Sequence, residues 1–362
     1  EEERIFILLV VVVLSIFDDL FVCVCVCVCV CAFFRIIICV CVCIDVMKTT
    51  IRMNILQGKL SNKAKPSFVR VLFHPSNFAR KLIRPLWFTG RMFDLDSYTT
   101  MSRVEESQFI ETMCLALLGN FAIAAILLLS GVKAPYGRYV SNQWWAGCMM
   151  NGKFAWIVQE APNLVMIAYF YYFTKGDSAA KASLPNRILL GCFAWHYVYR
   201  TCIFPLRIRG GKDTAFITFI MAFAFCACNG YLQGRTLTYI RVYPEEWLAT
   251  PQFRAGVLVW ALGWFSNFYH DSILINLRKP GETGYKIPKG GLFKYISGAN
   301  FFSEIMEWTG FAIACWNVPA ACFAMTTALN IGPRAIQHHN WYKEKFKGEY
   351  PPERKALIPF VY

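Results

Sequence analysis

Seven apolar segments follow one another through residues 101–362, and they constrain the fold more than any other feature of the chain. They cover residues 113–131, 154–173, 188–206, 214–232, 253–269, 302–318 and 319–331. A helix crosses a bilayer with about 20 apolar residues, because all its backbone hydrogen bonds are then satisfied internally. The sequence therefore predicts an all-α polytopic membrane protein with about seven transmembrane helices. The last two segments share Pro319 as a break, so a tilted pair or a re-entrant segment is an alternative there.

The composition agrees with a membrane protein, since 56% of the 362 residues are hydrophobic and 17% are charged. Soluble domains are typically about 45–50% apolar and about 25% charged. A net charge of +14 would favour nucleic-acid binding in a soluble protein. Here the cations lie between the apolar runs, where they orient membrane helices. We therefore expect no nucleic-acid partner.

Three basic segments define one side of the predicted bundle. Residues 207–212, 278–294 and 334–355 are separated from one another by even numbers of predicted crossings, so they face the same side. Basic loops remain in the cytosol, which places the C-terminus there and residue 101 in the lumen. This basic face can orient the protein, and it can equally bind a multiply anionic cofactor.

The first hundred residues differ in character from the rest. Cysteine and valine alternate from Cys23 to Cys31, and an in-frame TG dinucleotide repeat encodes this alternation. We interpret residues 1–100 as a non-native or disordered extension, with Met101 as the true start and 101–362 as the membrane domain. A genuine additional anchor at residues 5–44 is the alternative. Eight of the 16 cysteines lie between Cys23 and Cys43, and the other eight are scattered and follow no disulfide or zinc spacing.

Several ionisable residues fall inside apolar segments, where they are costly and usually functional. Glu160 lies in one such segment, and a paired carboxylate at a helix mouth is the structural alternative. Tyr197 and Arg200 are three residues apart and share a helix face, although an interfacial belt has the same pattern. Glu304 and Glu307 share a face by the same spacing, as helix-capping or ion-pairing groups also would.

A polar group follows the fifth apolar segment. Asn267 and Asp271 are four residues apart, with Arg278 just beyond them. Amide, carboxylate and guanidinium groups together suit ribose hydroxyls and phosphates, although a solvated helix end has the same composition. The chain contains no GxGxxG, GxxxxGK[ST] or HExxH motif. His338 and His339 are neighbours about 100° apart on a helix, so we expect no metal site.

Five longer motifs resemble the steroid 5-alpha-reductase family. They are QEAP (159–162), CNGYLQG (228–234), NLRKPGETGYKIPKGGLF (276–293), YISGANFFSEIMEW (295–308) and RKALIPF (354–360). Because they are long and rich in Gly, Pro and Trp, the resemblance is specific. It extends over residues 101–362 and leaves residues 1–100 without a counterpart.

The resemblance implies a seven-helix enzyme of the endoplasmic reticulum membrane, with an internal cavity for NADPH and a lipid substrate. It would reduce the Δ4 double bond of 3-oxo-Δ4-steroids by hydride transfer to carbon 5. Glu160 and Tyr197 correspond to the catalytic pair that polarises the 3-oxo group, and Trp156 and Gln159 would line the steroid pocket. The residues that correspond to the NADPH site are Arg200, Asn267, Asp271, Arg278, Tyr285, Asn300, His338 and Tyr342.

Four positions depart from the family pattern. Ser303 replaces the usual Gly before Glu304, Tyr269 stands where His is common, Gln337 breaks a His triplet, and Asn340 replaces a charged or polar neighbour. None of them removes a proposed catalytic group, but Ser303 is expected to tighten helix packing and weaken cofactor binding. Two other functions remain open. A polyprenal or trans-2-enoyl-CoA reductase would use the same hydride chemistry, whereas a channel or receptor would not bind NADPH.

Overall fold

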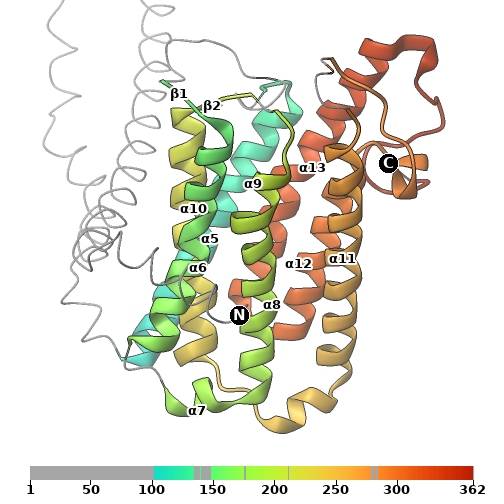
Figure 1. Cartoon of the computed structure of the whole chain (residues 1–362). Coiled ribbons are helices and arrows are strands. Elements are labelled where there is room, and N and C mark those ends of the chain that lie inside the picture. Colours follow the sequence, from blue (N-terminus) through green and yellow to red (C-terminus); the bar gives the residue numbers. More distant parts are fainter. Residues whose placement is uncertain are drawn as a thin grey trace, which may run out of the picture. The chain divides into compact units, whose positions relative to one another are not determined.

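The computed structural model describes residues 102–133, 139, 148–174, 177–210, 212–278, 282 and 284–361. The interpretation of residues 1–100 and of the start at Met101 lies outside these residues. Residues Arg103–Tyr362 form one compact unit, which Figure 1 shows as a bundle of long, roughly aligned helices.

Seven long helical stretches make up most of the described residues, and the prediction of an all-α fold is confirmed. They are α5 (Arg103–Leu129), α6 (Gly152–Tyr172), α8 (Leu184–Val198) continued by a π turn (Tyr199–Ile203) and α9 (Phe204–Arg207), α10 (Phe216–Arg235) continued by a π turn (Thr236–Ile240), α11 (Pro251–Ile275), α12 (Ala299–Cys315) and α13 (Val318–Phe346). The connecting elements are the antiparallel strands β1 (Met149–Met150) and β2 (Thr214–Ala215), helix α7 (Ser178–Ala182), and 3-10 turns at Glu245–Ala249, Gly291–Lys294 and Lys347–Glu349.

Three of these helices begin with a capping side chain and a proline in the first turn. The side-chain oxygens of Ser183, Thr250 and Asn317 accept backbone N–H groups at the starts of α8, α11 and α13. Proline suits the first turn because its missing N–H has no helical partner there. Pro319 therefore starts α13 and does not interrupt a helix. Trp316 adopts a left-handed backbone conformation, with φ 47°, between α12 and α13. The last two apolar segments therefore form two separate helices.

Small residues bring α11 and α12 into close contact. A Cβ atom at Gly256 would lie 2.3 Å from the backbone nitrogen of Ala314, and one at Gly263 would lie 2.4 Å from that of Glu307. At Gly310 the distance to the backbone nitrogen of Trp260 would be 2.2 Å. Small residues at such a seam let helix backbones approach, which is how helices commonly associate in membranes.

An aromatic cluster fills the interface of α8, α12 and α13. Trp308 is its centre, with ring-centroid distances of 4.3 Å to Phe323, 5.7 Å to Phe311 and 5.9 Å to Phe193. All four side chains are buried. Tyr197 stacks on Trp308 at 6.0 Å, so the aromatic cluster forms one wall around a predicted catalytic residue.

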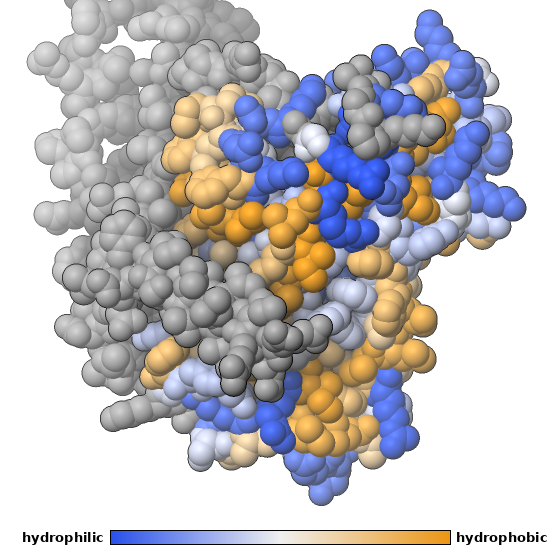
Figure 2. All heavy atoms as spheres, viewed as in Figure 1, coloured by the Kyte–Doolittle hydropathy of each residue, from blue (hydrophilic) through white to orange (hydrophobic). Residues whose placement is uncertain are grey.

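The outer surfaces of the helices are apolar. Leu115 and Ile126 on α5 and Leu258 and Phe265 on α11 are each at least 60% exposed. Figure 2 shows hydrophobic atoms along the flank of the bundle and hydrophilic atoms at its upper and lower ends. Among the described helices, Arg103–Leu129 and Phe216–Ile240 are long and apolar enough to cross a membrane. These features suit a membrane-associated protein, because a large exposed apolar surface marks a partner or lipid contact.

The described parts of the three basic segments lie at one end of the bundle, opposite α7, as the even number of crossings predicts (Figure 1). The C-terminal tail folds back onto this end. Ile296 and Lys355 form a parallel bridge, and the backbone N–H of Gly298 donates to the carbonyl of Ala356 at 2.9 Å. The tail therefore supports the chain just before α12.

Candidate functional site

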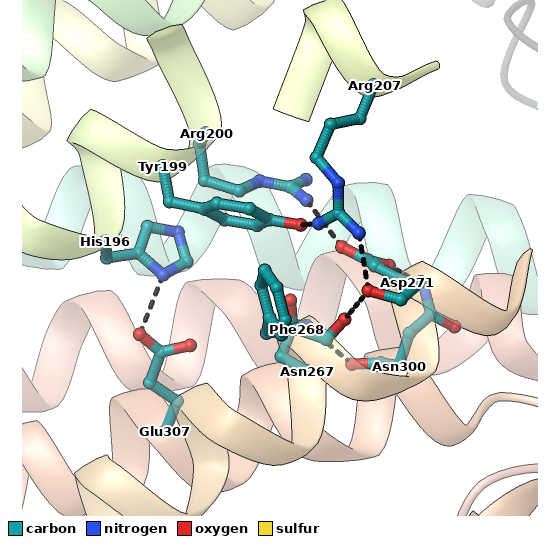
Figure 3. Close-up of polar contacts among 10 residues, drawn as sticks. His196, Tyr199, Arg200, Arg207, Asn267, Phe268, Asp271, Asn300 and Glu307 are labelled. Atoms are coloured by element: carbon teal, nitrogen blue, oxygen red, sulfur yellow. Dashed lines mark hydrogen bonds and ion pairs between the residues drawn. The ribbon is translucent and has the colours of Figure 1, made fainter. Parts of the chain in front are cut away.

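A buried hydrogen bond joins α8 to α12 inside the bundle. His196 Nδ1 lies 2.7 Å from Glu307 Oε1, and both side chains are at most 4% exposed (Figure 3). The His196 ring also packs against Trp308 at 4.5 Å and against Tyr197 at 5.0 Å. The sequence analysis singled out Glu307 but could not give its partner. Together these contacts fix the part of α8 that carries Tyr197.

A second polar chain links the end of α8 to α11 and α12. Arg200 donates to Asp271 Oδ2 at 3.1 Å, and the Asn300 amide donates to Asp271 Oδ1 at 3.3 Å. Asn267 donates to the Asn300 carbonyl at 2.9 Å. The structure thus brings four of the predicted cofactor residues into one hydrogen-bonded group, which Figure 3 shows beside the His196 pair. The π turn that holds Arg200 is typical of functional sites in helices.

Arg207 extends this polar region on α9. Its guanidinium donates to Tyr199 Oη and to Ser272 Oγ, both at 2.7 Å (Figure 3), and it lies 4.7 Å from the centre of the Phe268 ring. Sequence analysis counted Arg207 only as part of a basic loop. Tyr199 lies eight residues earlier in the same helical stretch, but Ser272 and Phe268 come from α11, so spacing along the chain could not reveal those two contacts.

Glu160 and Tyr197 lie close enough to interact electrostatically. The Cys226 thiol donates to Glu160 Oε2 at 3.7 Å. The Asn229 amide donates to Tyr197 Oη at 3.3 Å. Because the phenol oxygen accepts that bond, its own proton remains available for a substrate oxygen. Sequence reasoning missed Asn229 as a site residue, although an amide in an apolar helix is itself a signal of function.

Further charges surround this pair. Glu160 interacts electrostatically with Arg200, His196 and Glu304. Arg200 in turn interacts with Glu304 and Asp271. The two polar chains and the Glu160–Tyr197 pair are therefore electrostatically coupled, and one cation lies among three carboxylates.

Trp156 and Gln159 come from α6, within one turn of Glu160. Gln159 is buried, and Trp156 is half-buried. The Arg200 guanidinium lies 4.9 Å from the Trp156 ring, a cation–π contact. Trp156 Nε1 is buried and makes no hydrogen bond within the part of the chain that the structure describes. Glu307 Oε2 is likewise buried and has no hydrogen-bond partner among the described residues. A bound polar molecule would satisfy both atoms.

The remaining predicted cofactor residues lie in the loop before α12 and on α13. Arg278 donates to the Gly284 carbonyl at 3.4 Å, and Tyr285 packs edge-on against Trp341 at 4.8 Å. His338 lies 5.4 Å from Phe301, the neighbour of Asn300. Tyr342 is buried and stacks on Tyr350 at 5.6 Å.

A cavity of about 640 Å³ opens between the end of α9, the start of α6 and the end of α11. Its lining includes the cationic side chains of Lys153, Arg207 and Arg209 together with Asn276. Guanidinium and ammonium groups bind phosphates well. The cavity therefore suits an anionic ligand, and Arg207 connects it to the buried polar site.

The fold and the site define a membrane-associated helical protein with a polar, charged centre inside its bundle. A family model described as 3-oxo-5-alpha-steroid 4-dehydrogenase matches residues 212–362. The 3-oxo-5-alpha-steroid 4-dehydrogenase 1 of Rattus norvegicus is 48% identical over 249 residues, which cover 69% of this chain and 94% of that protein. The corresponding Homo sapiens protein is 48% identical over 209 residues, covering 58% and 79%. The 3-oxo-5-alpha-steroid 4-dehydrogenase 2 of Mus musculus is 41% identical over 253 residues, covering 68% and 96%. The chain belongs to the 3-oxo-5-alpha-steroid 4-dehydrogenase family, as the sequence motifs indicated.

Proposed function

We propose that this protein reduces the Δ4 double bond of 3-oxo-Δ4-steroids to give 5-alpha-3-oxosteroids, with hydride delivered to carbon 5. The observation that carries the proposal is the buried Tyr197 phenol. Asn229 holds its oxygen, its proton is available, and Glu160 lies within electrostatic range. That arrangement, in a chain 48% identical to a protein named for this reaction, supports steroid reduction over other uses of the same site.

The proposed chemistry needs an acid at the steroid carbonyl. When hydride reaches carbon 5 of a conjugated enone, negative charge develops on the 3-oxo oxygen. Tyr197 would donate a hydrogen bond or proton to that oxygen, aided by Glu160. A donor that is already positioned in a site without water stabilises such charge strongly. Proton delivery to carbon 4 then completes the reduction.

We further propose NADPH as the cofactor, which would supply the hydride. The polar groups present fit such a molecule, because Trp156 Nε1 and Glu307 Oε2 are buried donor and acceptor atoms without partners among the described residues. The cationic cavity beside Arg207 suits its phosphates. Ribose hydroxyls and phosphates would be held by Arg200, Asn267, Asp271, Arg278, Tyr285, Asn300, His338 and Tyr342.

The proposed setting is the endoplasmic reticulum membrane, crossed by seven helices, with the cofactor end in the cytosol. The location of the basic segments at one end supports this orientation. The exposed leucines of α5 and α11 would contact membrane lipid. A steroid would then enter the bundle from the bilayer, while the cofactor would enter from the basic end.

The test is turnover of a 3-oxo-Δ4-steroid by membranes containing the full chain, with NADPH. Tyr197→Phe and Glu160→Gln should each lower kcat by about 10²–10³, the usual cost of removing one oxyanion donor. Both variants should still bind NADPH. Tyr172→Phe is the matched control, because Tyr172 is 74% exposed. Normal turnover by both site variants would sink the assignment.

Parallel incubations with a polyprenal and a trans-2-enoyl-CoA separate the steroid reaction from its closest chemical alternatives. We expect saturated product from the steroid alone. If the wild-type chain does not bind NADPH, it is not a reductase of this kind.

A further inference from the structure

A cluster of two serines and a histidine lies between α11 and α12, next to the proposed site but outside it. We call Ser266, His270 and Ser303 the serine–histidine cluster. His270 is 2% exposed and Ser303 is fully buried. Ser266 Oγ lies 2.7 Å from Ser303 Oγ, and Ser303 donates to the Ala299 carbonyl at 2.7 Å. Since Ser303 has only one hydroxyl proton, Ser266 donates to Ser303.

The hydrogen bonds determine the tautomer of His270. The backbone N–H of Leu292 lies 2.9 Å from His270 Nε2 and can only donate, so Nε2 is an acceptor. His270 Nδ1 therefore carries the proton, and it donates to the Ser266 carbonyl at 2.6 Å. The neutral ring thus uses one nitrogen to hold its own helix and the other to hold a segment 22 residues further along the chain.

The segment held by His270 is the turn that enters α12. Gly291 has φ 50°, in the left-handed region that favours glycine. A Cβ atom there would lie 2.6 Å from His270 Nε2, so the chain passes directly over the ring. Phe293 packs edge-on against the same ring at 5.4 Å. The turn therefore rests on His270 both through a hydrogen bond and through packing.

This turn connects two of the proposed cofactor residues. Residues 284–300 run from the loop with Tyr285 through the turn to Asn300, whose amide donates to Asp271. Asp271 follows His270 directly in α11. Phe293 is anchored in a small apolar cluster with Ile296, but apolar packing has little directionality. The hydrogen bond from the Leu292 N–H to His270 therefore fixes the orientation of the turn.

We propose that His270 is a positioning residue for the cofactor, which fixes the turn at 290–294 and thereby sets Tyr285 and Asn300 relative to Asp271. This inference rests on the proposed NADPH-dependent reduction. Sequence analysis counted His270 in no site, because its partner is a backbone amide in a loop.

The experiment measures the Kd for NADPH by equilibrium binding to the solubilised full chain, and compares it with KM for NADPH, KM for the steroid and kcat in membranes containing the full chain. His270→Phe keeps an aromatic ring but leaves the Leu292 N–H without its acceptor. We expect KM for NADPH to rise about tenfold, equivalent to about 1.4 kcal/mol, while kcat and the steroid KM change by less than about threefold. His270→Gln should restore KM to within about threefold, since a glutamine amide oxygen reaches the place of Nε2 and accepts the same N–H.

Two variants separate positioning from general packing. Ser266→Ala removes a hydroxyl of the cluster but keeps the carbonyl that holds Nδ1–H, so KM for NADPH should stay within about twofold of wild type. Gly291→Ala pushes the turn off an intact His270 and should raise KM as His270→Phe does. This variant also decides the question if His270→Phe does not accumulate.

The inference is overturned if His270→Phe or Gly291→Ala has a wild-type KM for NADPH, if kcat and both KM values change together, or if His270→Gln is no better than His270→Phe. If the wild-type chain reduces the steroid with NADPH and the variants have the same KM for NADPH as the wild type, the positioning role of His270 is refuted while the proposed reduction stands. A wild-type chain without NADPH-dependent turnover overturns both proposals.

Discussion

Gly263 should be intolerant even of alanine, because two helix backbones meet at this residue. A Cβ atom there would lie 2.4 Å from the backbone nitrogen and 2.5 Å from the Cα of Glu307. Ordinary contact begins at 3.4 Å, so α12 would have to move by about 1 Å, the difference between 3.4 and 2.4 Å. Neither clashing atom can rotate away, since both belong to the helix backbone. The shift would also disturb the hydrogen bond between Glu307 and His196.

The expected loss of stability follows from two opposing effects. Overpacking a close contact costs about 1–3 kcal/mol, and a backbone clash belongs at the upper end. Alanine is favoured over glycine inside a helix by about 1 kcal/mol. The net cost is therefore about 2 kcal/mol. With about 2–4 °C per kcal/mol for a unit of this size, Tm should fall by about 4–8 °C.

The assay is thermal unfolding of the detergent-solubilised chain, with steroid turnover measured in parallel. Gly191→Ala in α8 is the matched control, because a Cβ atom at Gly191 meets nothing within 4 Å. Its Tm should stay the same or rise. If Gly263→Ala unfolds at the temperature of Gly191→Ala or above it, the close seam between α11 and α12 does not exist as described.

Three further outcomes are expected. Arg235 donates to both carboxylate oxygens of buried Glu106 at 2.6 Å. Arg235→Ala leaves that buried carboxylate unpaired and should destabilise the chain by about 3–5 kcal/mol in thermal unfolding. The double variant Arg235→Met, Glu106→Leu removes both charges and should cost less. Asp271→Asn removes the charge that pairs with the partly buried Arg200, and should raise KM for NADPH at least about tenfold; an unchanged KM would separate Asp271 from the cofactor. A hydrogen bond from Arg103, and to a smaller extent one from a backbone N–H, lowers the pKa of Asp177 in the folded chain. The ionised Asp177 therefore stabilises the fold fully above its unfolded-state pKa of about 3.9. This stabilisation is lost as the pH falls through the lower pKa of the folded state. Asp177→Asn should remove that part of the acid dependence of unfolding, and an identical acid profile would contradict it.

Local patterns in the sequence predict most of the helical framework. Each apolar segment became a helix, because a long apolar run satisfies its own backbone hydrogen bonds whatever surrounds it. The break at Pro319 is also local, since a proline suits the first turn of a helix. The end of α13 was not predicted, because Phe346 lies 15 residues beyond the apolar run that ends at residue 331. That last part is amphipathic, and the C-terminal tail covers it.

The sequence also grouped Asn267 with Asp271 four residues later, a spacing of about one helical turn. The family resemblance added Asn300 and Arg200 without saying how the four side chains meet. Their hydrogen-bonded order was visible only in the structure, because it depends on the π turn that directs Arg200 toward α11.

Taken alone, the sequence determined a helical membrane protein, the ends of several helices and the family to which the chain belongs. All of these depend on neighbouring residues or on motifs read in order. Only the tertiary structure decided that His196 pairs with Glu307, 111 residues away, and that His270 holds the turn before α12. The physical reason is that packing brings segments far apart in the sequence side by side, which places their buried polar groups within hydrogen-bonding distance, and no local pattern encodes that packing.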